Sequence, residues 1–280
     1  VEPNYFDSIF LLATLSAINR NFEESKKLLN KAINIEPNNL AAHNNLGNIE
    51  KQLKNYQEAI KSYEKTIQID PNHANAYFNL GILFYELKEF QKAINYFQKA
   101  VKIQPNYANA YFNLGNAHVE IKEFYKAISY YKKAIEINPD YIGAHNNLGL
   151  IFRGLNDFKN AISCYQKAIK IRPNHGGTHH NLALAFKEVG EFDKAISSHE
   201  SGIKYEPENL IHYYYLSELK KDVLNSEIKS KIKKILAKEN PALTNKAYGN
   251  FLLSKYENKI KNYKEELNYL IKGHRYFFET

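Results

Sequence analysis

Proline recurs along this chain at a fixed spacing, and that spacing constrains the fold more than any other feature. Six prolines stand 34 residues apart, at Pro37, Pro71, Pro105, Pro139, Pro173 and Pro207, and Pro241 extends the series. The octapeptide ANAYFNLG occupies residues 74–81 and again residues 108–115. A period of this size predicts a repeat array rather than one large globular domain.

Each 34-residue repeat combines two stretches with helical periodicity. With the proline at position 32, the repeats are 6–39, 40–73, 74–107, 108–141, 142–175 and 176–209, with a degenerate seventh at 210–243. Positions 4, 7 and 11 form one helical stripe, and positions 20, 24 and 27 form a second. The proline ends the second helix, because it cannot continue a helix and disfavours helical geometry in the residue before it.

The composition of these stripes predicts close packing of the helices. Position 7 is leucine in all seven repeats, and position 8 is Gly, Ala or Ser. Position 20 is alanine from Ala59 to Ala195, with Ser25 and Lys229 at the flanking repeats, whereas Thr66 and Gly202 replace the alanine of position 27. One helix pair cannot bury its apolar face alone, so the pairs must stack. We predict an all-α protein, an α-solenoid of antiparallel helix pairs.

The repeat AYFNLGILFYELKEFQKAINYFQKAVKIQP resembles the tetratricopeptide repeat family. It carries that family's pattern of a large residue, Leu-Gly, a second large residue, Ala, an aromatic residue, Ala and Pro. Six repeats match in phase over residues 6–209, and residues 1–5 are expected to end a preceding repeat. The resemblance implies a right-handed superhelix that serves as a scaffold for binding proteins or peptides.

Asparagine occupies position 6 of five successive repeats, at Asn45, Asn79, Asn113, Asn147 and Asn181. This position turns away from the second helix, toward the expected inner surface of the array. Asparagine is a mediocre helix former, but its amide offers two donors and two acceptor lone pairs. Such a row predicts a groove that binds the backbone of an extended polypeptide. Repeat duplication in an asparagine-rich chain is the alternative explanation.

The asparagine row is similar to the one that lines the repeats of O-linked N-acetylglucosamine transferases, which implies binding of substrate peptides. The row stops at Leu11 on one side and at Tyr215 on the other. We expect Phe78 and Phe112 to form side-chain pockets. The other candidates for the groove are Asn44, Asn48, Asn75, Tyr85, Asn109, Asn116, Asn146, Arg153 and His180. Co-chaperone members clamp a carboxylate with Lys and Arg at positions 2, 5 and 6, which are absent here, so we expect no such clamp.

Histidines raise the question of a metal site. His175, His179 and His180 stand close together, and a pair four residues apart on a helix can bind a metal. His179 occupies position 4, where other repeats carry His or Tyr, so we predict capping and core roles and no metal site. The chain has no phosphate-binding loop, zinc-type cysteine spacing or nucleophile elbow. We therefore predict no catalytic residue and no cofactor.

The composition of the chain excludes further classes of partner. The single cysteine, Cys164, excludes an internal disulfide, and we expect a cytoplasmic protein. No apolar run approaches the ~20 residues that span a bilayer, so we expect no membrane partner. The net charge is +8, but the positive excess lies after residue 209, and a near-neutral array argues against binding of nucleic acid. The chain contains no methionine, and we infer that it is part of a longer protein.

Residues 210–280 depart from the regular pattern. NLIHYYYLSELKKDV predicts a first helix, SEIKSKIKKILAKENP an amphipathic helix, and the remainder one more pair, with Gly249 inside it and Tyr263, Leu267 and Leu270 packing back. We expect these degenerate units to form a polar cap or a linker to a missing C-terminal domain.

YGNFLLSKYE and LNYLIKGHRYFF resemble the segment that joins tetratricopeptide repeats to a sulfotransferase domain in some bacterial proteins. That resemblance implies an alternative function. The chain would be the substrate-recognition arm of a larger transferase, either a sulfotransferase or a glycosyltransferase similar to O-linked N-acetylglucosamine transferases. Its catalytic domain would then lie outside this chain. Self-association through the ends of the solenoid is a third alternative.

Overall fold

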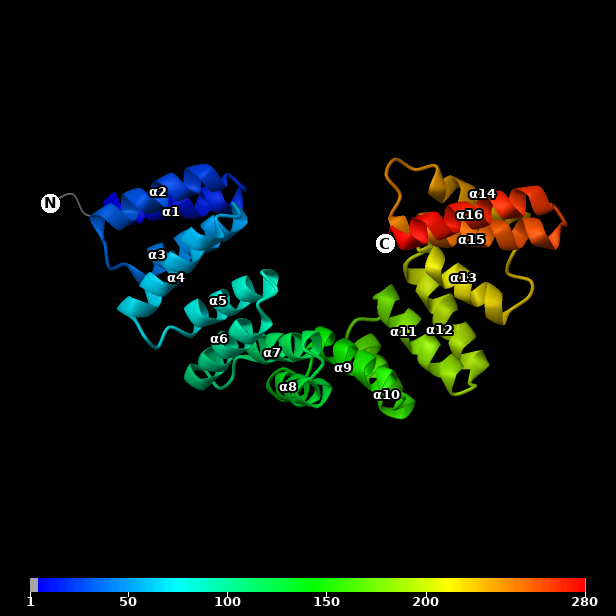
Figure 1. Ribbon diagram of the computed structural model, residues 1–280, viewed down its shortest axis with the longest axis horizontal. Coiled ribbons are helices and arrows are strands. Elements are labelled where there is room, and N and C mark those ends of the chain that lie inside the picture. Colours follow the sequence, from blue (N-terminus) through cyan, green and yellow to red (C-terminus); the bar gives the residue numbers. More distant parts are fainter. Residues whose placement is uncertain (1–4, 280) are drawn as a thin grey trace. The chain divides into compact units, whose positions relative to one another are not determined.

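The computed structural model describes residues 5–279, and all secondary structure in that range is helical (Figure 1). Within each of the first six repeats, an A helix is followed by a B helix. The pairs are α1 (Tyr5–Ile18) and α2 (Phe22–Ile35), α3 (Leu40–Gln52) and α4 (Tyr56–Ile69), α5 (Ala74–Glu86) and α6 (Phe90–Ile103), α7 (Ala108–Glu120) and α8 (Phe124–Ile137), α9 (Ile142–Gly154) and α10 (Phe158–Ile171), α11 (Gly176–Glu188) and α12 (Phe192–Tyr205). Every B helix ends two residues before the repeat's proline. The predicted α-solenoid of helix pairs is confirmed.

The chain divides into two compact halves, the first ending at Pro139 and the second beginning at Asp140. The N-terminal half contains α1 to α8 and the C-terminal half contains α9 to α16. Within each half, neighbouring A helices also touch each other, α3 with α5, α5 with α7, and α9 with α11. The A helices therefore carry one continuous surface in each half, and the asparagine row lies on these helices.

Position 8 is glycine where position 24 carries a six-membered ring. A Cβ added to Gly115 would lie 2.4 Å from the Tyr131 ring, and one added to Gly81 would lie 2.5 Å from Phe97. Alanine stands at position 8 in two repeats, Ala13 and Ala183, and there position 24 holds the smaller Leu29 or His199. The glycine makes room for the ring that fills the space between helices A and B.

The leucine of position 7 packs against the preceding repeat. Leu80 is fully buried in a cluster with Ala59 and Tyr63 of α4, and Leu114 is fully buried in the same core. Leu12 of α1 is 53% exposed, because the described residues contain no helix before α1. Ser25, which replaces the alanine of position 20, is buried and donates its hydroxyl hydrogen to the Ala13 carbonyl at 2.8 Å.

The turn between helices A and B uses one backbone conformation in every regular repeat. Position 15 has a positive φ throughout, 62° at Lys122, 62° at Asn156 and 77° at Gly190. Five of these turns carry Lys, Arg or Asn at this position, although an L side chain strains this conformation. The short segments KNY, KEF and NDF, which separate the two helical stretches of a repeat, are therefore tight turns.

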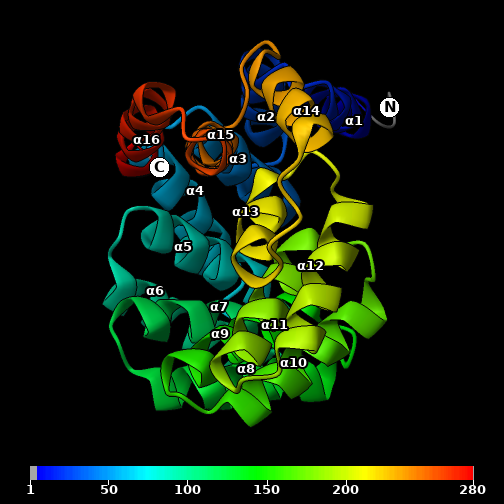
Figure 2. The same cartoon turned by 90° about the vertical axis from the view of Figure 1, so that its right-hand side faces the viewer.

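The C-terminal segment folds differently from a seventh regular repeat. It contains α13 (Leu210–Leu219), α14 (Ser226–Leu236), α15 (Leu243–Lys259) and α16 (Tyr263–Phe278). The closest packing neighbours of α13 are α12 and α15 rather than α14 (Figure 2). Residues 220–225 leave the helical path, and α15 rather than α14 packs beside α13. The degenerate repeat 210–243 is therefore not a helix pair of the regular kind.

The pair α15 and α16 repeats the regular design with its register shifted. Lys261 has the positive φ of position 15, at 61°. Glu257, five residues before Asn262, is buried and accepts a hydrogen bond from the Asn262 amide at 2.9 Å. Glu50 and Asn55 form the same bond at 2.7 Å in the second repeat. The predicted final helix pair is thus present.

The outer face of α16 contradicts the expectation of a polar cap. Tyr263, Leu267 and Leu270 do not pack back on the core, since they are 63%, 57% and 37% exposed. Ile271 and Phe278 of the same helix are also exposed. The contact of α16 with α15 is made instead through Gly273, where a Cβ would lie 2.6 Å from the Phe251 ring.

Candidate peptide-binding surface

The asparagines of position 6 lie on the A helices of both halves. In the N-terminal half they are Asn45 on α3, Asn79 on α5 and Asn113 on α7, and in the C-terminal half Asn147 on α9 and Asn181 on α11. Each is half-buried. Because α3, α5 and α7 touch in succession, the structure brings Asn45, Asn79 and Asn113 onto adjacent helices of one surface. The same holds separately for Asn147 and Asn181.

Two of these amides already make one hydrogen bond inside the protein. The amide of Asn79 donates to Oδ1 of Asn44 on the preceding A helix at 3.1 Å. The amide of Asn113 donates to the Asn109 carbonyl of its own helix at 2.8 Å. Each bond uses one of the two N–H donors of an amide that also has two acceptor lone pairs. These bonds fix the orientation of the side chains on the surface.

Four flanking candidates bind neighbouring side chains of the fold. Asn48 accepts a hydrogen bond from the Tyr63 hydroxyl at 2.8 Å, and Asn116 accepts one from Tyr131 at 2.7 Å. Asn75 accepts from the Tyr107 hydroxyl at 2.8 Å. Asn146 accepts from the Thr178 hydroxyl at 2.9 Å. A polypeptide partner would compete with these internal bonds, so their first role is structural.

The aromatic candidates are half-buried between core and surface. The ring of Phe78 lies 5.7 Å from that of Phe97 and 4.9 Å from that of Tyr107, between ring centroids. Phe112 packs on Tyr131 in the same way, at 5.7 Å. Both rings extend the buried core to the surface of helix A. Each therefore offers an apolar surface next to the asparagine row.

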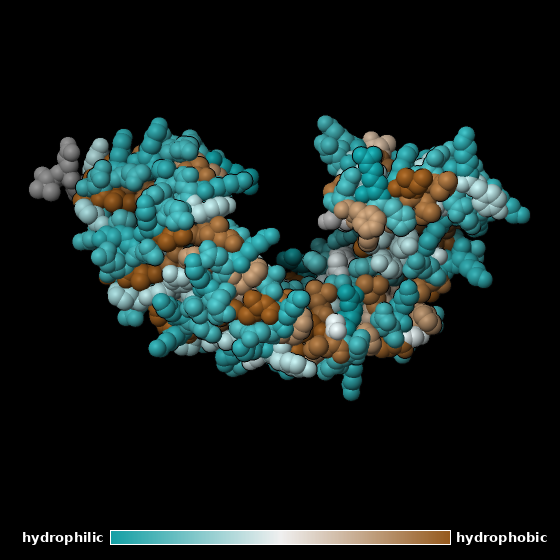
Figure 3. Space-filling model, in the orientation of Figure 1, coloured by the Kyte–Doolittle hydropathy of each residue, from teal (hydrophilic) through white to brown (hydrophobic). Residues whose placement is uncertain are grey.

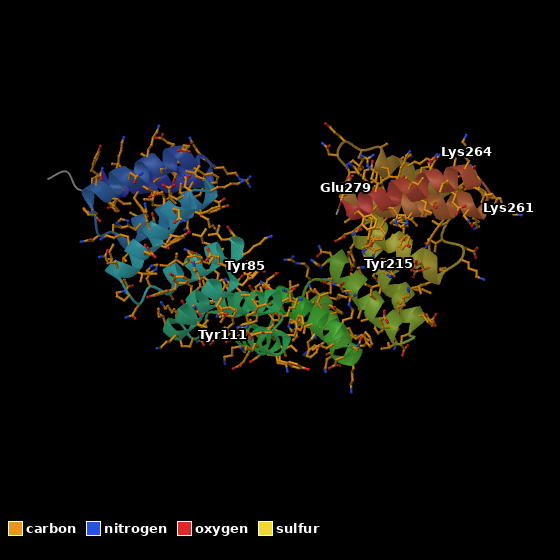
Figure 4. All side chains as sticks on the ribbon, in the orientation of Figure 1. Tyr85, Tyr111, Tyr215, Lys261, Lys264 and Glu279 are labelled. Atoms are coloured by element: carbon orange, nitrogen blue, oxygen red, sulfur yellow. The ribbon has the colours of Figure 1, made fainter. Side chains whose placement is uncertain are left out.

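Polar side chains near the C-terminal ends of successive A helices contact one another. Lys51 of α3 forms an ion pair with Glu86 of α5 at 3.1 Å. Tyr85, labelled on α5 in Figure 4, donates its hydroxyl hydrogen to Glu120 of α7 at 3.2 Å. Burial, followed by the charge of Glu120, raises the pKa of the Tyr85 hydroxyl, so this hydrogen stays in place at neutral pH.

A pocket of ≈ 300 Å³ adjoins the first asparagine of the row. Asn45 and Asn48 of α3 form its polar side, whereas Ala13, Ala17 and Ile18 of α1 contribute to its apolar side. Ser25 and Leu29 of α2 lie in its wall. An apolar side chain with a polar backbone group beside it matches this lining.

The histidines were only partly predicted. His175 caps α11 by accepting from the Thr178 amide at 3.2 Å, and His179 donates from Nε2 to the Pro173 carbonyl at 2.7 Å, so their capping and core roles are confirmed. His180 instead lies beside His199 and His212, with ring centroids 5.6 and 6.0 Å away. Sequence reasoning missed this group, because its members lie on three different helices.

Models of the tetratricopeptide repeat match residues 6–39, 38–106, 108–141, 143–175 and 164–197. Together they cover more than half of the chain, and the matches over 6–39 and 108–141 have the same bounds as the first and fourth repeats. The chain belongs to the tetratricopeptide repeat family. As a member, it is a scaffold for protein interaction built from stacked helix pairs.

Solved tetratricopeptide repeat structures share this architecture. The crystal structure of MamA matches with 28% identity and a TM-score of 0.55, over 58% of this chain and 95% of MamA. PilF of Pseudomonas aeruginosa matches with 20% identity and a TM-score of 0.65, over 76% of this chain and 97% of PilF. YrrB, described as a tetratricopeptide repeat protein with an unusual peptide-binding site, matches with 20% identity and a TM-score of 0.55, over 66% of this chain and 95% of YrrB.

Two further comparisons give negative results. No curated protein matches this sequence significantly. Among the described residues, none of the helices combines the length and the apolar character that crossing a lipid bilayer requires.

Proposed function

We propose that this tetratricopeptide repeat protein binds an extended polypeptide along the A-helix surface, through the asparagines of position 6. The observation that carries the proposal is the recurrence of one half-buried amide on helices that touch in succession, Asn45, Asn79 and Asn113. An amide pairs with peptide N–H and C=O groups whatever side chains the peptide carries. Binding along this row would therefore be directed at the peptide backbone.

Apolar surface next to the row supplies the second part of the proposal. Phe78 and Phe112 flank the asparagines, and the pocket beside Asn45 has room for one side chain. Backbone hydrogen bonds give affinity, and pockets for side chains give selectivity. The description of YrrB as a peptide-binding protein of the same fold supports a peptide as the partner.

Selection from a random peptide library on the immobilised chain supplies a probe for this function. Replacing both Asn79 and Asn113 by Ala should lower the affinity for the selected peptide by roughly 10-fold or more, because each lost hydrogen bond contributes about 1 kcal/mol. The matched control is Asn95→Ala, an exposed asparagine on the B helix α6. Equal affinity of the double variant and the wild type, at similar melting temperatures, contradicts the proposal.

A second candidate function makes this chain the recognition arm of a transferase, with a sulfotransferase as the first choice and a glycosyltransferase as the second. The observation in its favour is the apolar outer face of α16, where Leu267, Ile271 and Phe278 are exposed. Such a face fits a helix that further protein covers. The reading frame downstream of Thr280 tests it, since a nucleotide-sulfate-binding loop is required there, and a stop codon directly after Thr280 contradicts it.

A further inference from the structure

Three histidines from three consecutive helices meet in the C-terminal half. His180 lies on α11, His199 on α12 and His212 on α13, and one ring nitrogen from each lies within 4.8 Å of the others. The Nδ1 atoms of His199 and His212 are 3.4 Å apart. These two rings are 1% and 0% exposed, and His180 is half-buried. Tyr215, labelled in Figure 4, covers the group with its ring centroid 4.9 Å from that of His180.

The other repeats show that packing at these positions does not need histidine. The three residues occupy positions 5 and 24 of one repeat and position 3 of the next. In the repeat 74–107 the same positions hold Phe78, Phe97 and Ala110, and in the first repeat they hold Phe10, Leu29 and Ala42. All three positions thus carry histidine together only at the junction of the repeats 176–209 and 210–243.

A fourth change accompanies the three histidines. Position 27 is Ala in four of the five preceding repeats, but it is Gly202 here. A Cβ on Gly202 would lie 2.2 Å from Cε1 of His212, which is closer than any real contact. The glycine therefore provides the space for the His212 ring. Four coordinated departures from the repeat pattern indicate a built site rather than drift at one position.

An unpaired nitrogen atom points to a ligand. Nδ1 of His180 is buried and has no hydrogen-bond partner among the described residues. Most buried polar atoms in proteins have a partner, and each exception requires an explanation. A bound metal ion would accept the lone pair of His180 Nδ1, to which no group among the described residues donates a hydrogen.

The protonation state of the group suits a cation. Burial lowers the pKa of His180 to about 4, that of His199 to about 3 and that of His212 to about 4. All three rings are therefore neutral at pH 7, which is the form that binds metal ions. The carboxylate of Glu206 acts on His212 in the direction that favours positive charge.

We propose that His180, His199 and His212 bind one divalent transition-metal ion of the zinc type. Imidazole nitrogen suits Zn²⁺, Cu²⁺ and Ni²⁺. Two nitrogens bound tetrahedrally to zinc at about 2.1 Å lie about 3.4 Å from each other, which matches the 3.4 Å between Nδ1 of His199 and Nδ1 of His212. Three protein ligands leave one coordination position for water or a carboxylate. The ion would also join α11, α12 and α13.

Titration with Co²⁺ tests the proposal on the untagged chain, after treatment with EDTA and desalting. We expect one equivalent of Co²⁺ to bind with the visible absorption bands of a low-symmetry site, and Zn²⁺ to displace it. X-ray absorption of the zinc form should then show three imidazoles in the first shell. Absence of the bands, or fewer than three imidazoles, overturns the proposal without any variant.

Variants that restore the pattern of the other repeats provide the second arm. His199→Leu, which matches Leu29 beside Ala13 in the first repeat, and His212→Ala should each lower the affinity for Zn²⁺ by about 100-fold or more, with helical content checked by circular dichroism. The matched control is His179→Tyr, next to the group but outside it, since Tyr213 makes the same bond to Pro207 that His179 makes to Pro173. Equal affinity for Zn²⁺ in the wild type and both cluster variants contradicts the site.

Discussion

At the scale of single residues, positions 9 and 24 form a pair that explains part of the asparagine content. Asn48 and Asn116 stand at position 9 where position 24 is Tyr63 or Tyr131, and each accepts the tyrosine hydroxyl hydrogen. Ile82 stands there where position 24 is Phe97. Tyr165 departs from this rule, because position 9 of its repeat is Leu150, and its buried hydroxyl has no hydrogen-bond partner among the described residues.

Leu150→Asn should therefore stabilise the protein. Leu150 is 40% exposed, so little apolar burial is lost, and the new amide would accept the Tyr165 hydroxyl hydrogen. We expect the free energy of unfolding to rise by about 1 kcal/mol, measured by urea denaturation. Ile82→Asn is the control, since Phe97 has no hydroxyl to pair. A Leu150→Asn protein that loses as much stability as Ile82→Asn would show that the pairing rule is wrong.

The sequence predicted the buried residues better than the surface ones. Positions 7, 8 and 20 are core positions in the structure, because their residue types repeat with one helical spacing. Asn48 and Asn116 were predicted as groove residues from that spacing alone. The missing information was the tyrosine fifteen residues later in each repeat, which becomes a neighbour only when helices A and B pack.

At the scale of the helix pair, the left-handed residue at position 15 sets the turn between A and B. Gly190, with φ of 77°, has nothing within 4 Å of the point that a Cβ would occupy, so a side chain there affects only the backbone. Gly190→Ala should lower the free energy of unfolding by about 1 kcal/mol. Gly154→Ala, at the end of α9 and equally open, should raise it by about 0.5 kcal/mol. Thermal denaturation measures both, and equal signs would contradict this explanation.

The final helix pair depends on a buried carboxylate. Glu257 of α15 is 3% exposed and pairs with Lys229 of α14 at 2.7 Å. The hydrogen bond from Lys229 lowers the pKa of Glu257. A lowered pKa in the folded state means that the stabilisation is fully present above the unfolded value of about 4.3 and is lost as pH falls through the folded value.

Glu257→Gln should therefore destabilise the protein strongly at pH 7 and much less at pH 3, as measured by urea denaturation at both pH values. Glu58, in an exposed pair with Lys61, is the control, and Glu58→Gln should have little effect at either pH. A Glu257→Gln effect that is equal at pH 3 and pH 7 would show that the charge of Glu257 does not support this helix pair.

At the scale of the whole molecule, helix pairs could be predicted from sequence and their grouping could not. Proline and the turn residues are local signals, so they fix where each helix begins and ends. The division at Pro139 and Asp140, and the placement of α15 beside α13, depend on packing between distant residues. The group of His180, His199 and His212 was not predicted for the same reason. Comparing positions 5, 24 and 3 across the repeats would have shown that histidine stands at all three only here.

Stability in a stacked array depends on contacts between neighbouring pairs. Leu114→Ala removes a fully buried side chain inside the N-terminal half and should cost about 2–5 kcal/mol in the free energy of unfolding. Leu12→Ala changes the same repeat position, but Leu12 is 53% exposed, so we expect a cost below about 1 kcal/mol. Urea denaturation distinguishes them, and similar costs for both would contradict the stacking of position 7 on the preceding repeat.

The two halves present the same kind of surface in different chemical surroundings. Polar residues dominate the visible faces of both halves, with hydrophobic patches among them (Figure 3). In the N-terminal half the asparagine row adjoins phenylalanines and an apolar pocket. In the C-terminal half Asn181 follows His180, a member of the proposed metal site. We therefore expect the N-terminal half to bind the selected peptide, and tests of its surface can be made independently of the histidines.

The most direct measurement of peptide binding follows the side-chain amide signals of asparagine by NMR while the selected peptide is added. Binding along the A-helix surface predicts that the NH₂ signals of Asn79 and Asn113 shift with the occupancy of the peptide, whereas that of Asn95 on α6 stays in place. A peptide that binds and shifts Asn95, while Asn79 and Asn113 remain unchanged, would contradict the account.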